Sequence, residues 1–242
     1  MATRTRRPER RQEPLSRERI VSAAVELLDT VGESGLTFRA LAERLATGPG
    51  AIYWHVAGKA ELLAAATDAV VDTTITGHDA DAGPQEAIRA LALGVFEAID
   101  AHPWVGAQFA RTPWQSPMLR VFERIGRQVQ ALRVPEAAQF TAASALLNYI
   151  LGVAGQNAAN VRAVRPDTDR SEFLDAVATE WAELDADQYA FTRNVAGQLR
   201  KHDDEEEFLA GIDLILAGIT GITGITGATG IGGATARPLS AD

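Results

Sequence analysis

The sequence predicts an all-α protein in which a small N-terminal unit of short helices precedes a larger helical unit. Apolar residues recur at helical spacing in every periodic segment, and no run alternates regularly enough to indicate a strand. At 242 residues, the chain is long enough for two units with a substantial buried core.

The first expected helix begins after Ser16, a residue type that caps helix N-termini, and ends at Gly32. Its apolar residues follow the spacing of one helical face: Ile20, Ala24, Leu27, Leu28 and Val31. A second helix of about ten residues is expected from Thr37, another good N-cap. Its apolar face consists of Phe38, Leu41, Ala42 and Leu45.

A tight turn is expected between this helix and a third one. Residues 47–50, Thr-Gly-Pro-Gly, are expected to lie outside any helix because glycine and proline disfavour helix interiors. Helical spacing resumes over 51–56, and a fourth helix is expected over 59–72. Residues 16–75 are therefore interpreted as one domain, with a three-helix, helix-turn-helix arrangement.

The second expected domain, residues 84–216, follows a linker at 78–84 that is rich in Asp, Ala and Gly. Its helices are expected over 85–101, 105–111, 117–132, 135–162, 172–184, 188–201 and 205–216. Residues 217–242 contain Gly-Ile-Thr three times and then related triplets, but the repeat lacks the proline that favours a collagen-like form. A flexible, irregular Gly/Ile/Thr repeat tail is expected there.

Charge is unevenly distributed along the chain. The formal net charge is −9, yet ten basic residues balance ten acidic ones over residues 1–75, so the whole excess lies in the later part. The first twenty residues contain seven arginines: Arg4, Arg6, Arg7, Arg10, Arg11, Arg17 and Arg19. Residues 1–15 are expected to form a disordered basic arm that follows a DNA backbone. A merely solvated tail is the alternative.

Several classes of function are excluded by composition. No stretch approaches the roughly 18 apolar residues of a membrane span, and a secretory signal and cysteines are both lacking, so a cytoplasmic protein is expected. The chain has four histidines, no glycine-rich phosphate loop and no metal-ligand spacing. The acidic run at 203–207 is interpreted as a solvated helix start. No catalytic residue, metal or cofactor is expected.

The helix-turn-helix pattern predicts a DNA-reading surface. In such a motif the first helix braces a second, whose exposed side chains enter the major groove. Ile52 and Val56 are expected to be buried, so DNA contacts are expected from Gly50, Ala51, Tyr53, Trp54 and His55. Lys59 is suited to bind a phosphate. Core packing of Tyr53 and Trp54 is the alternative.

Residues 35–45 (GLTFRALAERL), residues 51–56 (AIYWHV) and Lys59 closely resemble the DNA-binding domain of the tetracycline-repressor (TetR) family. The resemblance extends from Ser16 to Leu63, and the Tyr-Trp-His-Val form resembles the tetracycline-repressor branch. It implies DNA-binding roles for Thr37, Arg39, Gly50, Ala51, Tyr53, Trp54, His55 and Lys59. Two departures leave the operator sequence open: Ala46-Thr47 replaces the usual Gly-Val, and Pro49-Gly50 displaces polar side chains from the helix tip.

The resemblance further implies a homodimer whose four-helix bundle uses the helices at 135–162 and 205–216. Residues 146–153 leave almost no polar face, as in a helix buried on both sides, although a buried monomer core explains the same pattern. A small-molecule cavity is expected in the larger domain. Its candidate lining residues, each alternatively core or surface, are Trp104, Phe109, Trp114, Asn148, Gln156 and Asn157. His102 is interpreted as a helix-end cap rather than a ligand contact.

These expectations define a ligand-responsive transcriptional repressor. As a dimer it binds a palindromic operator in double-stranded DNA, and a small-molecule inducer releases it. An exporter or natural-product gene is the expected target. The alternative is an activator, or another DNA-binding regulator of the same fold, with little ligand control.

Overall fold

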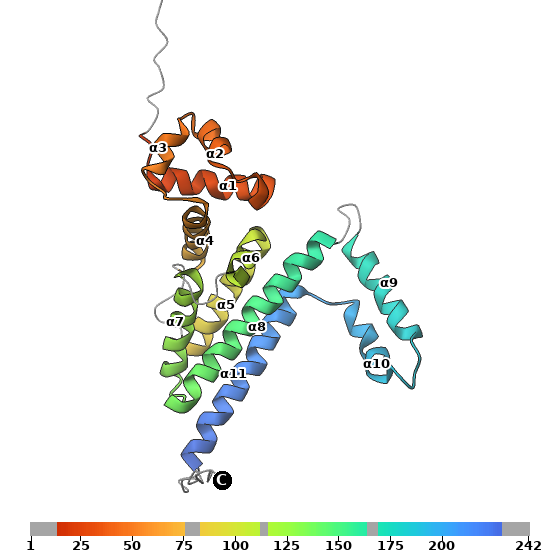
Figure 1. Ribbon diagram of the computed structural model, residues 1–242. Coiled ribbons are helices and arrows are strands. Elements are labelled where there is room, and N and C mark those ends of the chain that lie inside the picture. The colour runs from red at the N-terminus through yellow and green to blue at the C-terminus, as the bar shows by residue number, and fades with distance from the viewer. Residues whose placement is uncertain (1–13, 76–82, 112–115, 164–168, 229–242) are drawn as a thin grey trace, which may run out of the picture. The chain divides into compact units, whose positions relative to one another are not determined.

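The computed structural model describes residues 14–75, 83–111, 116–163 and 169–228 (Figure 1). These residues form eleven helices and no strand, which confirms the all-α prediction. They divide into two compact units, the first ending at Val70 and the second beginning at Val71. Trp114, nearly all of the basic arm and the end of the repeat tail lie outside the described residues.

The N-terminal unit contains α1 (Arg17–Gly35), α2 (Phe38–Leu45), α3 (Pro49–Tyr53) and most of α4 (Lys59–Ile75). The Ser16 hydroxyl accepts a hydrogen bond from the Arg19 amide over 3.3 Å and caps α1. Gly32, at φ 69° and ψ −176°, leaves the helical conformation within α1, at the position where the helix was expected to end. This backbone region is accessible essentially to glycine alone.

The core of the N-terminal unit comes from one face of each helix. Its fully buried apolar side chains are Ile20, Ala24, Leu36, Leu41, Ile52, Val56, Leu62 and Ala66. Burying a leucine or isoleucine side chain stabilises a fold by about 1.5–3 kcal/mol. Ile52 therefore holds α3 in place although the helix is only five residues long.

The expected turn at 47–50 is wrong in its second half, because α3 begins at Pro49. Gly48 is the N-cap and Pro49 occupies the first helical turn, where its fixed φ suits a helix and its missing N–H would have no helical partner. The turn consists instead of residues 46–48, with Ala46 at φ 51°.

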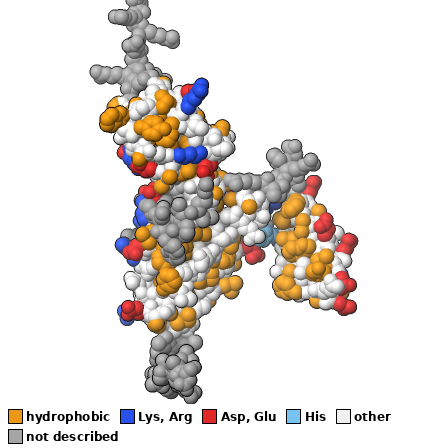
Figure 2. All heavy atoms as spheres, in the orientation of Figure 1, with side chains coloured by type: hydrophobic (Ala, Val, Ile, Leu, Met, Phe, Trp, Pro, Cys, Tyr) orange, Lys and Arg blue, Asp and Glu red, His pale blue; other side chains and the backbone are white. Residues whose placement is uncertain are grey.

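The larger unit contains α5 (Pro84–Ala101), α6 (Trp104–Arg111), α7 (Ser116–Ala131), α8 (Glu136–Ala163), α9 (Arg170–Glu183), α10 (Ala190–Leu199) and α11 (Asp204–Ala228). The helices expected between residues 85 and 201 begin and end within two residues of these bounds. The central helix α8 packs on α5, α6, α7 and α11, while α9 and α10 pack on each other. Figure 2 shows apolar side chains on the surface of the α9–α10 hairpin. The exposed large ones in this part of the chain are Phe173, Tyr189 and Phe191.

The irregular tail expected from residue 217 is wrong as far as residue 228, because α11 continues to Ala228. Adding a residue to an existing helix is far easier than starting one. Buried Leu216 and Ile219 anchor the first repeats, and the Thr220 hydroxyl bonds to the Leu216 carbonyl within the helix. Glycine at every third position weakens a helix but does not end this one.

By length and composition alone, the part of α8 from Glu136 to Asn160 could cross a membrane. The central helix of a globular domain has the same properties. Packing of α8 on α5, α6, α7 and α11 buries some of its apolar residues, among them Leu146, Leu147 and Ile150.

Candidate nucleic-acid interface and ligand cavity

The aromatic residues at the end of α3 lie largely on the surface. The Tyr53 ring stacks on Phe38 of α2 with centroids 4.3 Å apart and planes 1° apart, and Tyr53 remains 55% exposed. Trp54 is 90% exposed. Core packing of Trp54, the alternative interpretation, is therefore wrong. Tyr53 packs its ring against Phe38 and remains more than half exposed.

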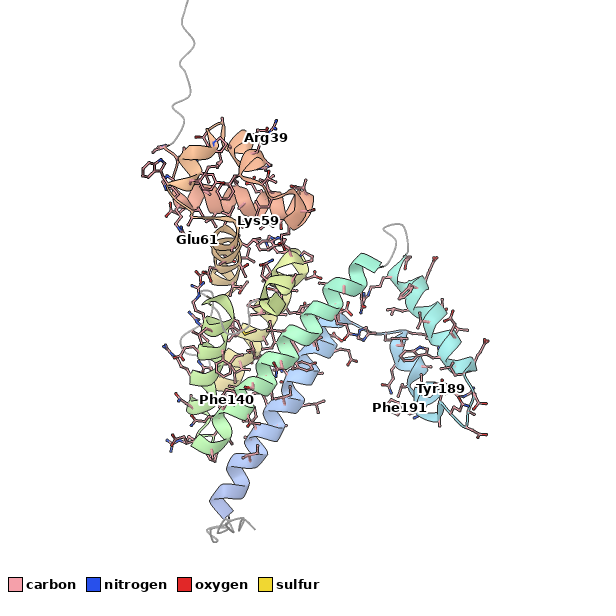
Figure 3. The ribbon with its side chains drawn as sticks, in the orientation of Figure 1. Arg39, Lys59, Glu61, Phe140, Tyr189 and Phe191 are labelled. Carbon is pink, nitrogen blue, oxygen red and sulfur yellow. The ribbon has the colours of Figure 1, made fainter. Side chains whose placement is uncertain are left out.

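Helix α2 supports α3 and presents a cation (Figure 3). The Thr37 hydroxyl accepts a hydrogen bond from the Ala40 amide over 3.1 Å, so Thr37 acts as the N-cap of α2. Arg39 is exposed and donates from Nε to Glu43 over 3.0 Å, a surface pair that costs little to break. Gly50 is also exposed, and a methyl group there would meet no atom within 4 Å. Packing within the unit therefore does not require glycine at position 50.

A hydrogen-bonded clamp joins the start of α1 to the corner between α3 and α4. Arg17 Nη1 donates to the His55 carbonyl and to Glu61 Oε1, both over 2.7 Å. Glu61 Oε2 accepts from the Ala57 amide, also over 2.7 Å. This backbone hydrogen bond and the Arg17 guanidinium lower the pKa of Glu61 below its ordinary value. The clamp fixes where α3 ends.

Two residues of this clamp, Arg17 and Glu61, were missed as candidates in the sequence. Glu61 is the third residue of α4, the position of the acidic residue in a capping box, and this spacing could have identified it. His55 is half-buried and takes part through its carbonyl, while the Lys59 ammonium donates to the Glu33 carbonyl over 2.6 Å. Lys59 lies on the surface, at the first position of α4.

The expected ligand residues do not gather in one place. Trp104 and Phe109 are buried in the core, and Asn148 is exposed on α8. Gln156 and Asn157, in contrast, line a cavity of about 290 Å³ between α5, α8 and the start of α11. Of the described candidate ligand residues, Gln156 and Asn157 line this cavity, whereas Trp104, Phe109 and Asn148 do not, and the ligand-binding roles stay a prediction.

The apolar side of this cavity is formed by Phe96, Tyr149, Val153 and Phe208. Phe208 stacks on Phe96 at 4.7 Å and on Tyr149 at 5.7 Å between centroids. The Tyr149 hydroxyl donates to the Phe208 carbonyl over 3.2 Å. Burial raises the pKa of the Tyr149 phenol, and the Glu207 carboxylate adds to the rise.

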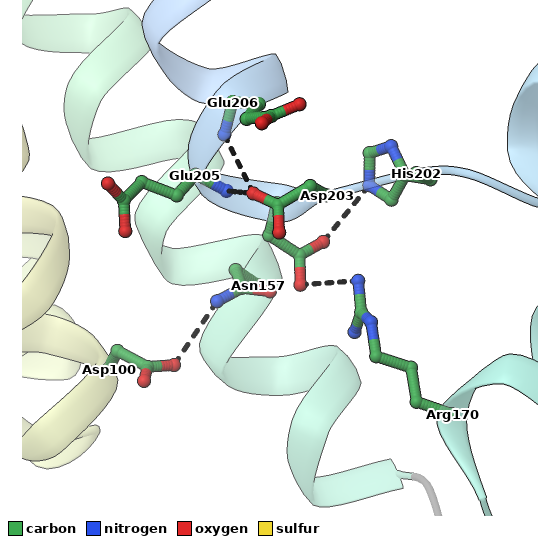
Figure 4. Close-up of polar contacts among 8 residues, drawn as sticks. Asp100, Asn157, Arg170, His202, Asp203, Glu205 and Glu206 are labelled. Atoms are coloured by element: carbon green, nitrogen blue, oxygen red, sulfur yellow. Dashed lines mark hydrogen bonds and ion pairs between the residues drawn. The ribbon is translucent and has the colours of Figure 1, made fainter.

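The polar side of the cavity is formed by Gln156, Asn157, Asn160, His202, Asp204 and Glu207. Figure 4 shows how part of it is held: Asn157 Nδ2 donates to Asp100 over 3.2 Å, and Asp204 contacts both Arg170, at 2.7 Å, and His202, at 3.0 Å. Across the part of the chain that the structure describes, no three His, Cys, Asp or Glu side chains are grouped so as to hold a metal ion.

The short exposed helix α3, braced by α1 and α2, and the separate helical unit with its cavity define the class of helix-turn-helix DNA-binding proteins. Comparison with known proteins identifies the family. Residues 20–66 match the family described as "Bacterial regulatory proteins, tetR family", and residues 77–222 match "Tetracyclin repressor-like, C-terminal domain". The chain belongs to the TetR family of transcriptional regulators.

Individual relatives agree with this assignment. The structure of SCO7222, a TetR regulator from Streptomyces coelicolor, is 65% identical, with 86% of this chain and 99% of that one covered at a TM-score of 0.80. An HTH-type transcriptional regulator of Saccharopolyspora erythraea is 29% identical over 88% of this chain and 89% of its own length. The HTH-type transcriptional repressor DrrR1 of Streptomyces coeruleorubidus is 37% identical over 41% of this chain and 38% of its own length.

Membership in the family confirms the expected class of function. Proteins of the TetR family are DNA-binding regulators and not enzymes, and they bind operator DNA and small-molecule ligands.

Proposed function

We propose that the protein is a homodimeric transcriptional repressor that binds a palindromic operator and is released by a small-molecule inducer. The observation that carries the proposal is the end of α3, where Trp54 and Tyr53 are exposed beside a backbone that the Arg17 clamp holds in place. In the complex, the major groove is contacted by Arg39, Gly50, Ala51 and the residues around them. Lys59 gives up its hydrogen bond to the Glu33 carbonyl and binds a phosphate instead. The target is an exporter or natural-product gene. The name of DrrR1, a repressor, supports repression rather than activation.

The DNA-binding part is tested by fluorescence anisotropy with fragments from the upstream region of the gene. Trp54→Ala is expected to weaken binding about tenfold, equivalent to about 1.4 kcal/mol. Leu119→Ala, which also removes an exposed apolar side chain but lies on α7, is the matched control and is expected to bind normally. Deleting residues 1–12 should weaken binding and lower its salt dependence if the basic arm lies along the DNA. Failure to bind any upstream fragment contradicts the proposal.

Dimerisation is supported by exposed faces on α8 and α11 that consist mostly of small or apolar residues. On α8 they are Thr141, Ala145, Asn148, Gly152 and Ala159, and on α11 they are Ala210, Leu214, Ala217, Gly218, Gly221 and Ile222. Small residues let helices of two subunits approach closely. A soluble protein rarely leaves a large side chain such as Leu214 76% exposed on such a face without a partner.

The dimer is tested by light scattering after size-exclusion chromatography. Wild-type protein is expected at twice the chain mass of 25.8 kDa. Leu214→Arg places a charge on the proposed interface without disturbing the subunit core, so it is expected to yield a folded monomer that binds operator weakly. Leu119→Arg, an equal change on the exposed face of α7, is expected to remain dimeric. A dimeric Leu214→Arg protein contradicts this interface.

Ligand control is supported by the cavity between α5, α8 and α11, which combines an aromatic side with amide, imidazole and carboxylate groups. Compounds made or exported by the products of neighbouring genes are expected to dissociate the protein–DNA complex. If none does, and deletion of the gene lowers neighbouring transcripts, the protein is the alternative, an activator with little ligand control.

A further inference from the structure

We propose that the cavity between α5, α8 and α11 selects planar aromatic compounds that carry a positively charged amine. This inference rests on the proposed ligand control and names the chemical class of the ligand. It follows from the shape, the charge and the size of the cavity.

The apolar side of the cavity is built on aromatic rings that order one another. Phe208 lies between Phe96 and Tyr149, with interplanar angles of 26° and 11° to these rings. The Tyr149 hydroxyl is held by the Phe208 carbonyl, so its ring cannot turn freely. Phe208 and Phe96 are buried, so half-buried Tyr149 is the ring of this stack that a flat ligand meets, and aromatic rings prefer such offset stacking.

The polar groups that line the cavity include two carboxylates, Asp204 and Glu207. Asp204 is engaged by Arg170 and His202, at 2.7 and 3.0 Å. Glu207 lines the same cavity, and no cation among the described residues pairs with it. Its charge reaches the aromatic wall, because it contributes to the raised pKa of Tyr149. A ligand that stacks on the wall therefore has a carboxylate within reach.

The surroundings of the cavity decide the sign of the favoured charge. The N-terminus of α11 carries a partial positive charge of about half a unit, which alone favours an anion. The first turn of α11 contains Asp204, Glu205, Glu206 and Glu207, and Asp203 accepts hydrogen bonds from the amides of Glu205 and Glu206. Arg170 compensates for one of these carboxylates only. The net field at the cavity thus favours a cation and repels an anion.

The volume of about 290 Å³ suits a small ring system. It lies at the lower end of ligand cavities, which span roughly 300–1,000 Å³. An indole or naphthalene with an aminoalkyl chain is of suitable size. The amides of Gln156, Asn157 and Asn160 add hydrogen-bonding groups along the rim.

Three compounds with one ring system and different charge test this inference: tryptamine, tryptophol and indole-3-acetate. Their dissociation constants for the full-length protein, without DNA, are measured at neutral pH by ligand-observed NMR. Tryptamine, the cation, is expected to bind about three- to tenfold tighter than neutral tryptophol, as one partly exposed charge pair permits. Indole-3-acetate, the anion, is expected to bind most weakly.

The variant Glu207→Gln is expected to reduce the preference for tryptamine over tryptophol to less than about twofold. Glu206→Gln removes the same charge from the neighbouring exposed position, outside the cavity lining, and is expected to retain the preference. Circular dichroism confirms that both variants fold. The inference is overturned if no probe binds, if indole-3-acetate binds tightest, or if Glu206→Gln and Glu207→Gln behave alike.

Binding of the unliganded protein to upstream DNA is measured in parallel. If the protein binds this DNA but the three indoles do not follow the expected order, only the inference about ligand class fails. If the protein binds no upstream DNA, the proposed repressor function fails whatever the indoles do.

Discussion

Replacing Ala46 by glycine is expected to stabilise the N-terminal unit by about 0.5–1 kcal/mol. Ala46 lies in the left-handed region, at φ 51° and ψ 45°. The Thr47 amide bonds to the Ala42 carbonyl over 3.0 Å and the Ala46 amide to the Glu43 carbonyl over 3.3 Å, so the end of α2 is a Schellman motif. A Cβ in this conformation costs about 1–2 kcal/mol. Glycine removes this cost but loses about 0.5–1 kcal/mol more conformational entropy on folding. The Ala46 methyl is exposed, so the substitution sacrifices no packing.

For a unit of this size, a stabilisation of 1 kcal/mol raises the unfolding temperature by roughly 4–8 °C. Thermal unfolding of the full-length protein, followed by circular dichroism, measures the shift. Hydrogen exchange of peptides from α1 to α3 assigns it to the N-terminal unit. Because glycine retains the turn, operator affinity is expected to remain unchanged.

Two control variants separate backbone strain from other effects. Ala46→Val adds a β-branched side chain at positive φ and is expected to destabilise the same unit. Arg133, at φ 60°, ends α7 in the same conformation, so Arg133→Gly is expected to stabilise the larger unit without changing exchange in α1 to α3. An Ala46→Gly protein no more stable than wild type, together with a tolerated Ala46→Val, refutes the reasoning.

Three further results are expected. Glu61→Gln should destabilise the N-terminal unit at neutral pH. Folding lowers the pKa of Glu61, so the greater stability of the wild type is present above the ordinary value of 4.5 and is lost as acid protonates Glu61. Unfolding curves of the two proteins, measured from pH 7 to 3, should therefore converge. Gly211→Ala should destabilise the larger unit by about 1–3 kcal/mol, because its methyl would overlap the Tyr149 hydroxyl; urea unfolding measures the loss. Gly126→Ala lies in the middle of α7, where a methyl group would meet no neighbouring atom, and should instead stabilise the larger unit by about 0.5–1 kcal/mol. Equal effects of Gly211→Ala and Gly126→Ala on the free energy of unfolding would contradict the packing argument.

The helices, their caps and the helix-turn-helix could be predicted because their signals are local. Ser16, Gly32 and Thr37 act on backbone groups within a few residues, and the apolar spacing of a helix is visible along the chain. The prediction failed where one residue type has two roles. A proline in a helix interior breaks the helix, whereas a proline in the first turn suits the start of a helix. Pro49 has the second role, and this follows only from the buried position of Ile52, which places α3 in the core.

The sequence by itself determined the helical class, the order of the helices and the place of the helix-turn-helix. Only the tertiary structure decided which aromatic residues line a cavity. Trp104 is buried in the core, whereas Phe208, close behind an acidic run, packs between rings from α5 and α8. The physical reason is that the spacing of apolar residues along the chain shows only which side chains share one face of a helix. Which other helix meets that side depends on contacts between residues far apart in the chain, such as Tyr149 and Phe208.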